Sequence, residues 1–164
     1  MSRLDDYRTA LLAAHPDVAG ERLVAALDER PTEFPSFVVD MGLGPLWRER
    51  TGRAEFHASR LQAEALYLAQ ERSLDEIGAA LDAAGIEHVA IKGAATRLLL
   101  YDNPAVRASF DIDLLVRSAD RVEAAETISQ LGFTPLPEAK SISRELVLTR
   151  SGTDVDLHWG LLRE

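Results

Sequence analysis

The chain has 164 residues, of which 46% are hydrophobic, 27% charged and 6% aromatic, and these proportions exclude collagen-like, disordered and membrane-spanning proteins. Its 18 Lys and Arg against 27 Asp and Glu give a net charge of −9, which disfavours binding to the phosphate backbone of nucleic acids. The absence of cysteine excludes disulfides, thiolate metal ligands and a cysteine nucleophile, so any metal ion must be bound by oxygen or imidazole.

Residues 1–85 are expected to form an all-helical cap or subdomain, because Ala and Leu dominate and apolar residues recur every three or four positions. Short helices are expected on both sides of Pro16. Between Pro31 and Gly52, prolines and glycines interrupt the pattern, which indicates a packed connector. The N-terminus lacks the apolar core of a signal peptide, so we expect a cytoplasmic protein without membrane contact.

The helical spacing returns at Arg53 and continues to Gly85, which is a favourable C-terminal cap. Ser73 and Glu76 have the spacing of a capping box, so two abutting helices fit this segment as well as one long helix. The apolar stripes of the helical half are compatible with dimerisation, with capping of a substrate or with core packing. A second copy of the chain is therefore among the candidate partners.

Residues 86–164 are expected to form an α/β core, with a small mixed sheet of about four strands and flanking helices. The expected elements are a strand at 86–91, a helix at 94–101, a strand at 110–116, a helix at 118–131, and a hairpin of 144–149 and 154–159. Short β-branched runs predict the strands, and Gly132 and Ser151–Gly152 mark the turns.

Two carboxylates lie side by side on the strand predicted at 110–116. Side chains alternate along a strand, so Asp111 and Asp113 point to one face while the apolar residues between and after them point to a core. Neighbouring carboxylates repel each other unless a cation lies between them, and oxygen ligands favour Mg²⁺ or Mn²⁺. Alone, this D-x-D pattern is more typical of a solvated edge strand than of a metal site, and a third interpretation is the metal motif of a glycosyltransferase that binds a nucleotide sugar.

The last predicted strand carries Asp154, Asp156 and His158 on one face. Asp156 is a candidate third carboxylate, and three carboxylates from neighbouring strands fit a two-metal site. Asp154 competes for this role from the same face, although it lies nearer the turn. His158 is either a packed structural residue or a contact to the substrate. The chain's histidines lack the spacing of a zinc site, and no G-x-S-x-G motif of a serine hydrolase is present.

The turn after the first predicted strand contains Lys92, Gly93 and Ala94. A glycine there allows the backbone to approach a ligand closely, and the free N–H groups that open the next helix favour phosphate. Many strand-to-helix turns contain glycine for steric reasons alone, and Lys92 is equally compatible with pointing into solvent. The turn by itself is therefore a weak indication of a phosphate site.

Taken together, these motifs resemble the polymerase-beta-type nucleotidyltransferase superfamily and, more narrowly, its branch of uncharacterised nucleotidyltransferases. The resemblance covers about residues 86–160 and includes Ile91–Ala95, Leu100–Tyr101, Pro104, Arg107, Asp111–Arg117, Leu131–Phe133 and Val155–Trp159. It implies a polymerase-beta-type fold and the transfer of a nucleoside monophosphate from an NTP, such as ATP, to a hydroxyl of a small molecule or protein. Nucleic acid is not the expected acceptor, because the chain is acidic.

The same resemblance implies roles for three aspartates. Asp111 and Asp113 would bind both Mg²⁺ (or Mn²⁺) ions, and Asp156 would bind the catalytic ion and help to deprotonate the acceptor. The glycosyltransferase interpretation would leave Asp156 and Gly93 without assigned roles. A catalytically silent module that binds nucleotide, or regulates a partner, is the alternative from a different functional class.

Ala94 departs from the superfamily, which usually has a serine after the glycine to contact the triphosphate. Lys92, Arg107 and Ser109 are candidates to replace that contact, and Arg107 fits best because a guanidinium matches phosphate oxygens. Arg107 is equally compatible with neutralising nearby carboxylates. The chain ends at Glu164, soon after the last predicted strand, whereas related proteins continue with further helices. We therefore expect either a fragment or an acceptor site completed by the N-terminal helices or by a second subunit.

Overall fold

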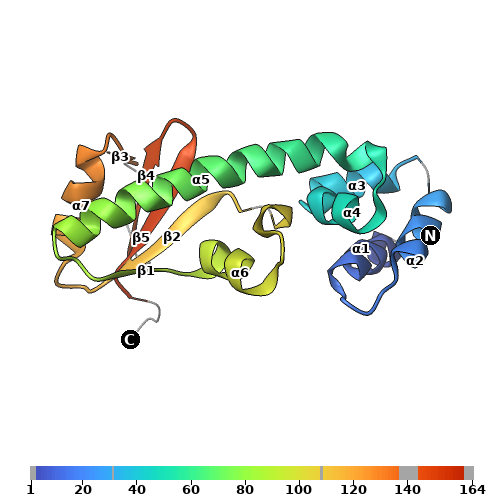
Figure 1. Ribbon diagram of the computed structural model, residues 1–164, viewed down its shortest axis with the longest axis horizontal. Helices are drawn as coiled ribbons and strands as arrows, with labels where there is room; N and C mark the ends of the chain where they lie inside the picture. The colour runs from blue at the N-terminus through green and yellow to red at the C-terminus, as the bar shows by residue number, and fades with distance from the viewer. Residues whose placement is uncertain (1–2, 31, 108, 137–143, 161–164) are drawn as a thin grey trace. The chain divides into compact units, whose positions relative to one another are not determined.

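The computed structural model describes residues 3–30, 32–107, 109–136 and 144–160 (Figure 1). The chain divides into two compact units, each described by itself below. The first unit contains Met1–Tyr67 and Tyr101–Ala108, and the second contains Leu68–Leu100 and Ser109–Glu164. The described part of the chain has no helix with the length and hydropathy needed to span a bilayer.

The first unit is helical, as expected. It contains α1 (Arg3–Leu11), α2 (Gly20–Asp28), α3 (Phe34–Asp40), α4 (Gly44–Thr51) and the beginning of α5 (His57–Ala83). The segment expected to be a packed connector therefore forms the two helices α3 and α4. Pro35 and Pro45 lie in their first turns, where a missing N–H costs no helical hydrogen bond, so these prolines start helices rather than break them.

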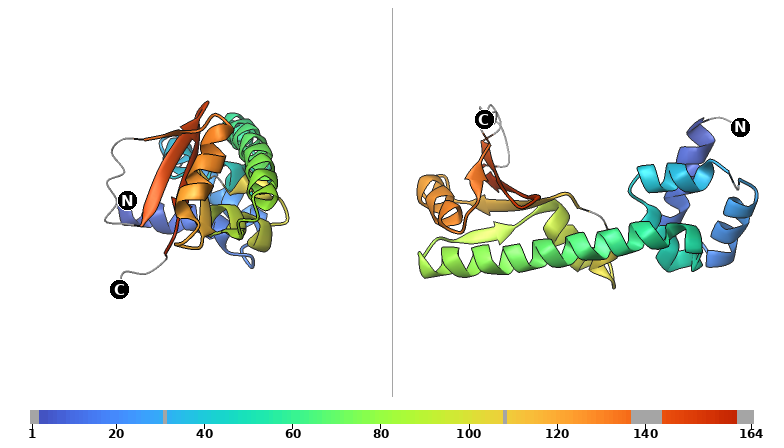
Figure 2. Two further views of the ribbon diagram at one scale, coloured as in Figure 1. Left: turned by 90° about the vertical axis from the view of Figure 1, so that its left-hand side faces the viewer. Right: turned by 90° about the horizontal axis from the view of Figure 1, so that it is seen from above.

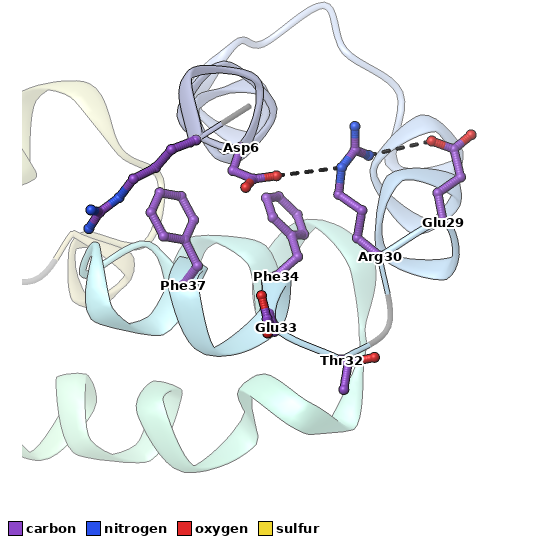
Figure 3. A pocket seen from close by; sticks show the side chains of 8 residues that line it. Asp6, Glu29, Arg30, Thr32, Glu33, Phe34 and Phe37 are labelled. Atoms are coloured by element: carbon purple, nitrogen blue, oxygen red, sulfur yellow. Dashed lines mark hydrogen bonds and ion pairs between the residues drawn. The ribbon is translucent and has the colours of Figure 1, made fainter. Parts of the chain in front are cut away.

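Aromatic packing holds this first unit together. Trp47 is fully buried, packs edge-on against Phe34, and donates a hydrogen bond from Nε1 to the carbonyl oxygen of Ala10 at 2.9 Å. A surface pocket nearby is lined by Asp6, Arg30 and Phe34, among others (Figure 3). Arg30 pairs there with Asp6 and lies over the ring of Phe34, so it links α1 to α3.

The second unit is built on a mixed sheet of five strands in the order β1-β2-β5-β4-β3 (Figures 1 and 2). The strands are β1 (His88–Ala90), β2 (Asp111–Val116), β3 (Thr134–Pro135), β4 (Glu145–Arg150) and β5 (Thr153–His158). The central pair, β2 and β5, is parallel, and the other pairs are antiparallel. The expected α/β class is confirmed, and the strand beyond the expected four is the two-residue β3.

One face of the sheet forms the core of this unit. Apolar side chains of β2, β4 and β5 pack there against the C-terminal half of α5 and against α7 (Arg121–Gln130). The fully buried side chains include Ile77, Leu81, Ile112, Leu114, Ile128, Leu148 and Leu157. Since side chains alternate along each strand, the residues between them face away from this core. The opposite face therefore carries the polar residues of β2 and β5.

The helix α5 runs without interruption through Ser73 and Glu76, so the single long helix is the correct alternative. It ends before Gly85, whose φ of +71° favours glycine, and the N–H of Ile86 bonds back to the carbonyl of Leu81. The helix α7 begins at Arg121 with Asp120 as its N-terminal cap, two residues after the expected cap Ser118. The expected division of function at residue 85, between a helical region and a nucleotidyltransferase-like core, stays a prediction.

Candidate functional site

The register between β2 and β5 places two aspartates side by side. Asp113 is opposite Asp156, and Asp111 is opposite Asp154. Neighbouring strands lie about 4.8 Å apart, so the carboxylates of an opposed pair on the same face are close neighbours. The sequence predicted which strand faces carry these aspartates, and the register selects Asp156 over Asp154 as the neighbour of Asp113.

His158 lies next to this pair and is as deeply buried as Asp113, each being 3% exposed. Its Nε2 is 2.9 Å from Asp113 Oδ1, and its Nδ1 is 3.5 Å from an oxygen of Glu145 on β4. The imidazole therefore connects three strands through two carboxylates. His158 is packed, as one of the two expected alternatives has it, and the other alternative, a contact to the substrate, stays a prediction. We call Asp113, Glu145, Asp156 and His158 the polar cluster.

Lys92 brings a positive charge to the same atoms. Its Nζ donates a hydrogen bond to Asp113 Oδ1 at 2.6 Å and lies 3.2 Å from His158 Nε2. The hydrogen bond to Asp113 raises the pKa of Lys92, and the negative charges of Asp113, Asp156 and Glu145 act in the same direction. Lys92 thus points toward the cluster, although more than half of its side chain is exposed.

The negative charges of the neighbouring carboxylates repel one another in this partly buried site. Burial raises the pKa of Asp156, and the charges of Asp111, Asp113 and Glu145 raise it further, against the opposite effect of His158. A cation reverses such repulsion, and the Lys92 ammonium already does so in part. The carboxylate oxygens and imidazole nitrogens of the cluster are atoms that bind divalent ions in proteins.

Among the described residues, Asp113, Asp156 and His158 each offer a ligand atom, and these atoms lie within 4.8 Å of one another. This spacing fits one divalent ion bound by two carboxylates and an imidazole. Asp111 lies outside this set of three, on the same face and half-buried. It is close enough for its charge to raise the pKa of Asp156.

A series of hydrogen bonds among buried polar residues positions Asp111. The hydroxyl of Ser109 lies 3.2 Å from the carbonyl oxygen and 3.4 Å from Oδ1 of Asp111, and it donates toward both. The carbonyl of Ser109 accepts a hydrogen bond from Gln70 of α5 at 3.1 Å, and Gln70 accepts one from Arg97 at 2.6 Å. Ser109 is therefore engaged in positioning the start of β2, and its expected contact to phosphate stays a prediction.

The remaining candidates lie in two places. Gly93 and Ala94 are buried in the first turn of α6 (Lys92–Leu100), immediately after Lys92. The N–H of Ile91, just before this turn, donates to the carbonyl of Asp113 at 3.0 Å, which ties the turn to β2. Arg107 belongs to the first compact unit, and its role in phosphate binding stays a prediction.

Sequence reasoning missed Glu145 and Gln70. Glu145 is opposite His158 across β4 and β5, and Gln70 is fully buried within α5. The expected hairpin contained a usable signal for Glu145, because a tight turn at Ser151–Gly152 fixes which residues are opposed. Gln70 carried no local signal, since its partners are 27 and 39 residues away in the chain.

A family model described as "Uncharacterised nucleotidyltransferase" matches residues 48–164, which is more than half of the chain. No curated protein and no solved structure matches. The matched segment includes Lys92 and every member of the cluster around Asp113.

Proposed function

The chain belongs to the family described as uncharacterised nucleotidyltransferases, and on this basis we propose a metal-dependent transfer of a nucleoside monophosphate from an NTP to a hydroxyl group. The acceptor would be a small molecule or a protein, because the net charge of −9 opposes binding of nucleic acid. The observation that carries the proposal is the opposition of Asp113 and Asp156 on parallel strands, beside Asp111 and His158.

Asp111, Asp113 and Asp156 are the proposed ligands of Mg²⁺ or Mn²⁺, and His158 adds an imidazole nitrogen to the set. Such ions would neutralise the triphosphate and increase the acidity of the acceptor hydroxyl. Ser109 holds Asp111 through its hydroxyl, and the N–H of Ile91 holds the backbone of Asp113. These contacts keep the carboxylates in place as charge develops.

In the proposed reaction, the acceptor oxygen forms a bond to the α-phosphorus and the bond from that phosphorus to the bridging oxygen breaks, which releases pyrophosphate. The acceptor proton passes to Asp156. Burial and the charges of Asp111 and Asp113 raise the pKa of Asp156 in the ion-free protein, and bound ions would oppose that rise. Asp154 is left outside this role because it is opposite Asp111, one pair further from His158.

Phosphate binding is assigned to the turn between β1 and α6. Lys92 supplies a positive charge there, and Gly93 and Ala94 supply backbone N–H groups at the start of the helix. Arg107 and Ser109 are the further candidates for contacts to the triphosphate. Ala94 offers no hydroxyl at the position where the wider superfamily usually has serine. That difference favours the second candidate function, a nucleotide-binding module without turnover.

The two functions are separated by incubating the protein with α-³²P-labelled ATP, GTP, CTP or UTP, Mn²⁺, and small-molecule or protein acceptors. An enzyme transfers the label to the acceptor and releases unlabelled pyrophosphate.

For Asp156→Asn we expect retained NTP binding and turnover reduced at least about 100-fold, since the charge that takes the proton is lost. Asp154→Asn is the matched control and should keep turnover within about threefold of wild type. NTP binding without transfer to any acceptor would support the module, and near-normal turnover in Asp156→Asn would refute its role.

A further inference from the structure

Lys92 occupies the position on Asp113 and His158 that a bound ion would need. Its Nζ lies 2.6 Å from Asp113 Oδ1 and 3.2 Å from His158 Nε2, and both of these residues belong to the three-residue ligand set. A divalent ion at the same atoms would bring two further positive charges within a few ångströms of the ammonium. Like charges at that distance repel strongly inside a protein. The ammonium and the ion therefore compete for Asp113 and His158.

The side chain of Lys92 can move away from this contact more easily than the side chain of Asp113 can. The side chain of Asp113 is 4% exposed and fixed in the sheet, whereas the side chain of Lys92 is 56% exposed. A lysine ammonium on a flexible four-carbon stem can leave such a contact without any change in the backbone. Lys92 also has a φ of +47°, a conformation that non-glycine residues rarely adopt and that favourable contacts must offset. The backbone conformation of Lys92 thus directs its side chain toward the cluster, and the flexible stem allows the ammonium to move away.

We propose that Lys92 is a built-in counter-ion of Asp113 and His158 that a divalent ion displaces, and that the displaced ammonium then binds the triphosphate. Displacement requires only the ion, whereas the contact to the triphosphate rests on the function proposed above. Lys92 directly precedes Gly93 in the first turn of α6, so its ammonium stays within reach of phosphates bound at that turn. Ion and nucleotide then bind cooperatively, because the nucleotide stabilises the lysine that the ion releases.

Calorimetry with Mn²⁺ alone tests the displacement. Lys92→Met keeps the stem and removes the competing charge, so we expect Mn²⁺ to bind about tenfold more tightly or better than to wild type. Arg117→Met is the matched control, since it removes one positive charge after the far end of β2, where Arg117 pairs with exposed Glu87. It should leave Mn²⁺ affinity within about twofold of wild type. Unchanged or weaker Mn²⁺ binding by Lys92→Met would overturn the displacement.

Lys92→Met also tests whether Lys92 binds the triphosphate, and for ATP we expect a loss of affinity instead of a gain. At saturating Mn²⁺, we expect Lys92→Met to bind ATP about tenfold more weakly than wild type, because the charge offered to the triphosphate is gone. A variant that gains affinity for the ion and loses affinity for the nucleotide is not explained by a purely structural lysine. Equal ATP binding by wild type and Lys92→Met would refute the triphosphate contact.

Acylation of Lys92 in the wild-type chain tests the displacement without a variant, so the test applies even if Lys92→Met does not fold. The chain has one other lysine, Lys140, which serves as the internal reference for acylation followed by mass spectrometry. We expect Mn²⁺ to increase acylation of Lys92 at least about threefold and ATP to reverse the increase, since a paired ammonium is a poor nucleophile. Acylation of Lys92 that does not rise with Mn²⁺ would overturn the displacement. Absence of any ATP binding by wild type would instead refute the proposed function, and an Mn²⁺-dependent rise would still support the displacement.

Discussion

Gln70 is predicted to stabilise the candidate site from within α5. Its fully buried amide accepts a hydrogen bond from Arg97 at 2.6 Å and donates one to the carbonyl of Ser109 at 3.1 Å. Ser109 in turn holds Asp111 at the start of β2. The substitution Gln70→Met has nearly the same volume and removes both hydrogen bonds, so it tests this support without creating a large cavity.

The expected cost follows from the two lost bonds. A buried carbonyl without its donor costs about 1–3 kcal/mol, and a hydrogen bond to a charged group such as Arg97 contributes about 1.5–3 kcal/mol. The more apolar methionine side chain offsets about 1 kcal/mol of this sum through better burial. We therefore expect Gln70→Met to lower the free energy of unfolding by about 3 kcal/mol and the melting temperature by about 6–12 °C.

Urea denaturation followed by circular dichroism measures this change. Gln62→Met is the matched control, because Gln62 is an exposed glutamine on the same helix and its replacement should change stability by less than about 0.5 kcal/mol. Mn²⁺ calorimetry on Gln70→Met should also show weaker binding, since Asp111 is less firmly placed. If Gln70→Met lies within about 0.5 kcal/mol of wild type, the inferred support of β2 by α5 is wrong.

Two further predictions concern the pKa of Asp156 and the first unit. The pKa of Asp156 is raised, so protons compete with Mn²⁺ at higher pH than for an ordinary aspartate, and Mn²⁺ affinity should fall as the pH decreases through that pKa. Calorimetry over a series of pH values measures the fall, which should be larger for wild type than for Asp156→Asn because only wild type has this carboxyl, and an equal fall in the two proteins would contradict the assignment. Trp47→Phe removes the hydrogen bond to the carbonyl of Ala10 and leaves a small cavity, so it should lower the free energy of unfolding by about 2–3 kcal/mol. Thermal denaturation checks this value, and an unchanged melting temperature would contradict it.

Local patterns predicted much of the site because strands alternate. The sequence placed Asp111 and Asp113 on one strand face, and Asp156 with His158 on another, and β2 and β5 have these faces. The parallel pairing that joins the two strands depends on contacts between segments more than 40 residues apart, such as His158 with Asp113. A shift of two residues in that register would place Asp154 opposite Asp113, so the sequence alone left both aspartates as candidates.

The errors in the helical half have a different origin. Pro35 and Pro45 lie in the segment expected to be a connector, because proline disrupts the interior of a helix. In α3 and α4 they occupy the first turn, where the fixed φ of proline favours helix formation. The position of a proline relative to the start of a helix depends on where the apolar residues around Trp47 pack. That packing is a tertiary property, which the local spacing of residues does not contain.

Asp113 and Asp156 are proposed to bind together the ion that positions a nucleotide. The most direct measurement is an anomalous difference map from crystals grown with Mn²⁺ and a non-hydrolysable ATP analogue. We expect an Mn²⁺ peak coordinated by both carboxylates, with the triphosphate beside Lys92 and Gly93. A peak bound elsewhere, or a nucleotide bound away from these aspartates, would contradict the proposed ion site.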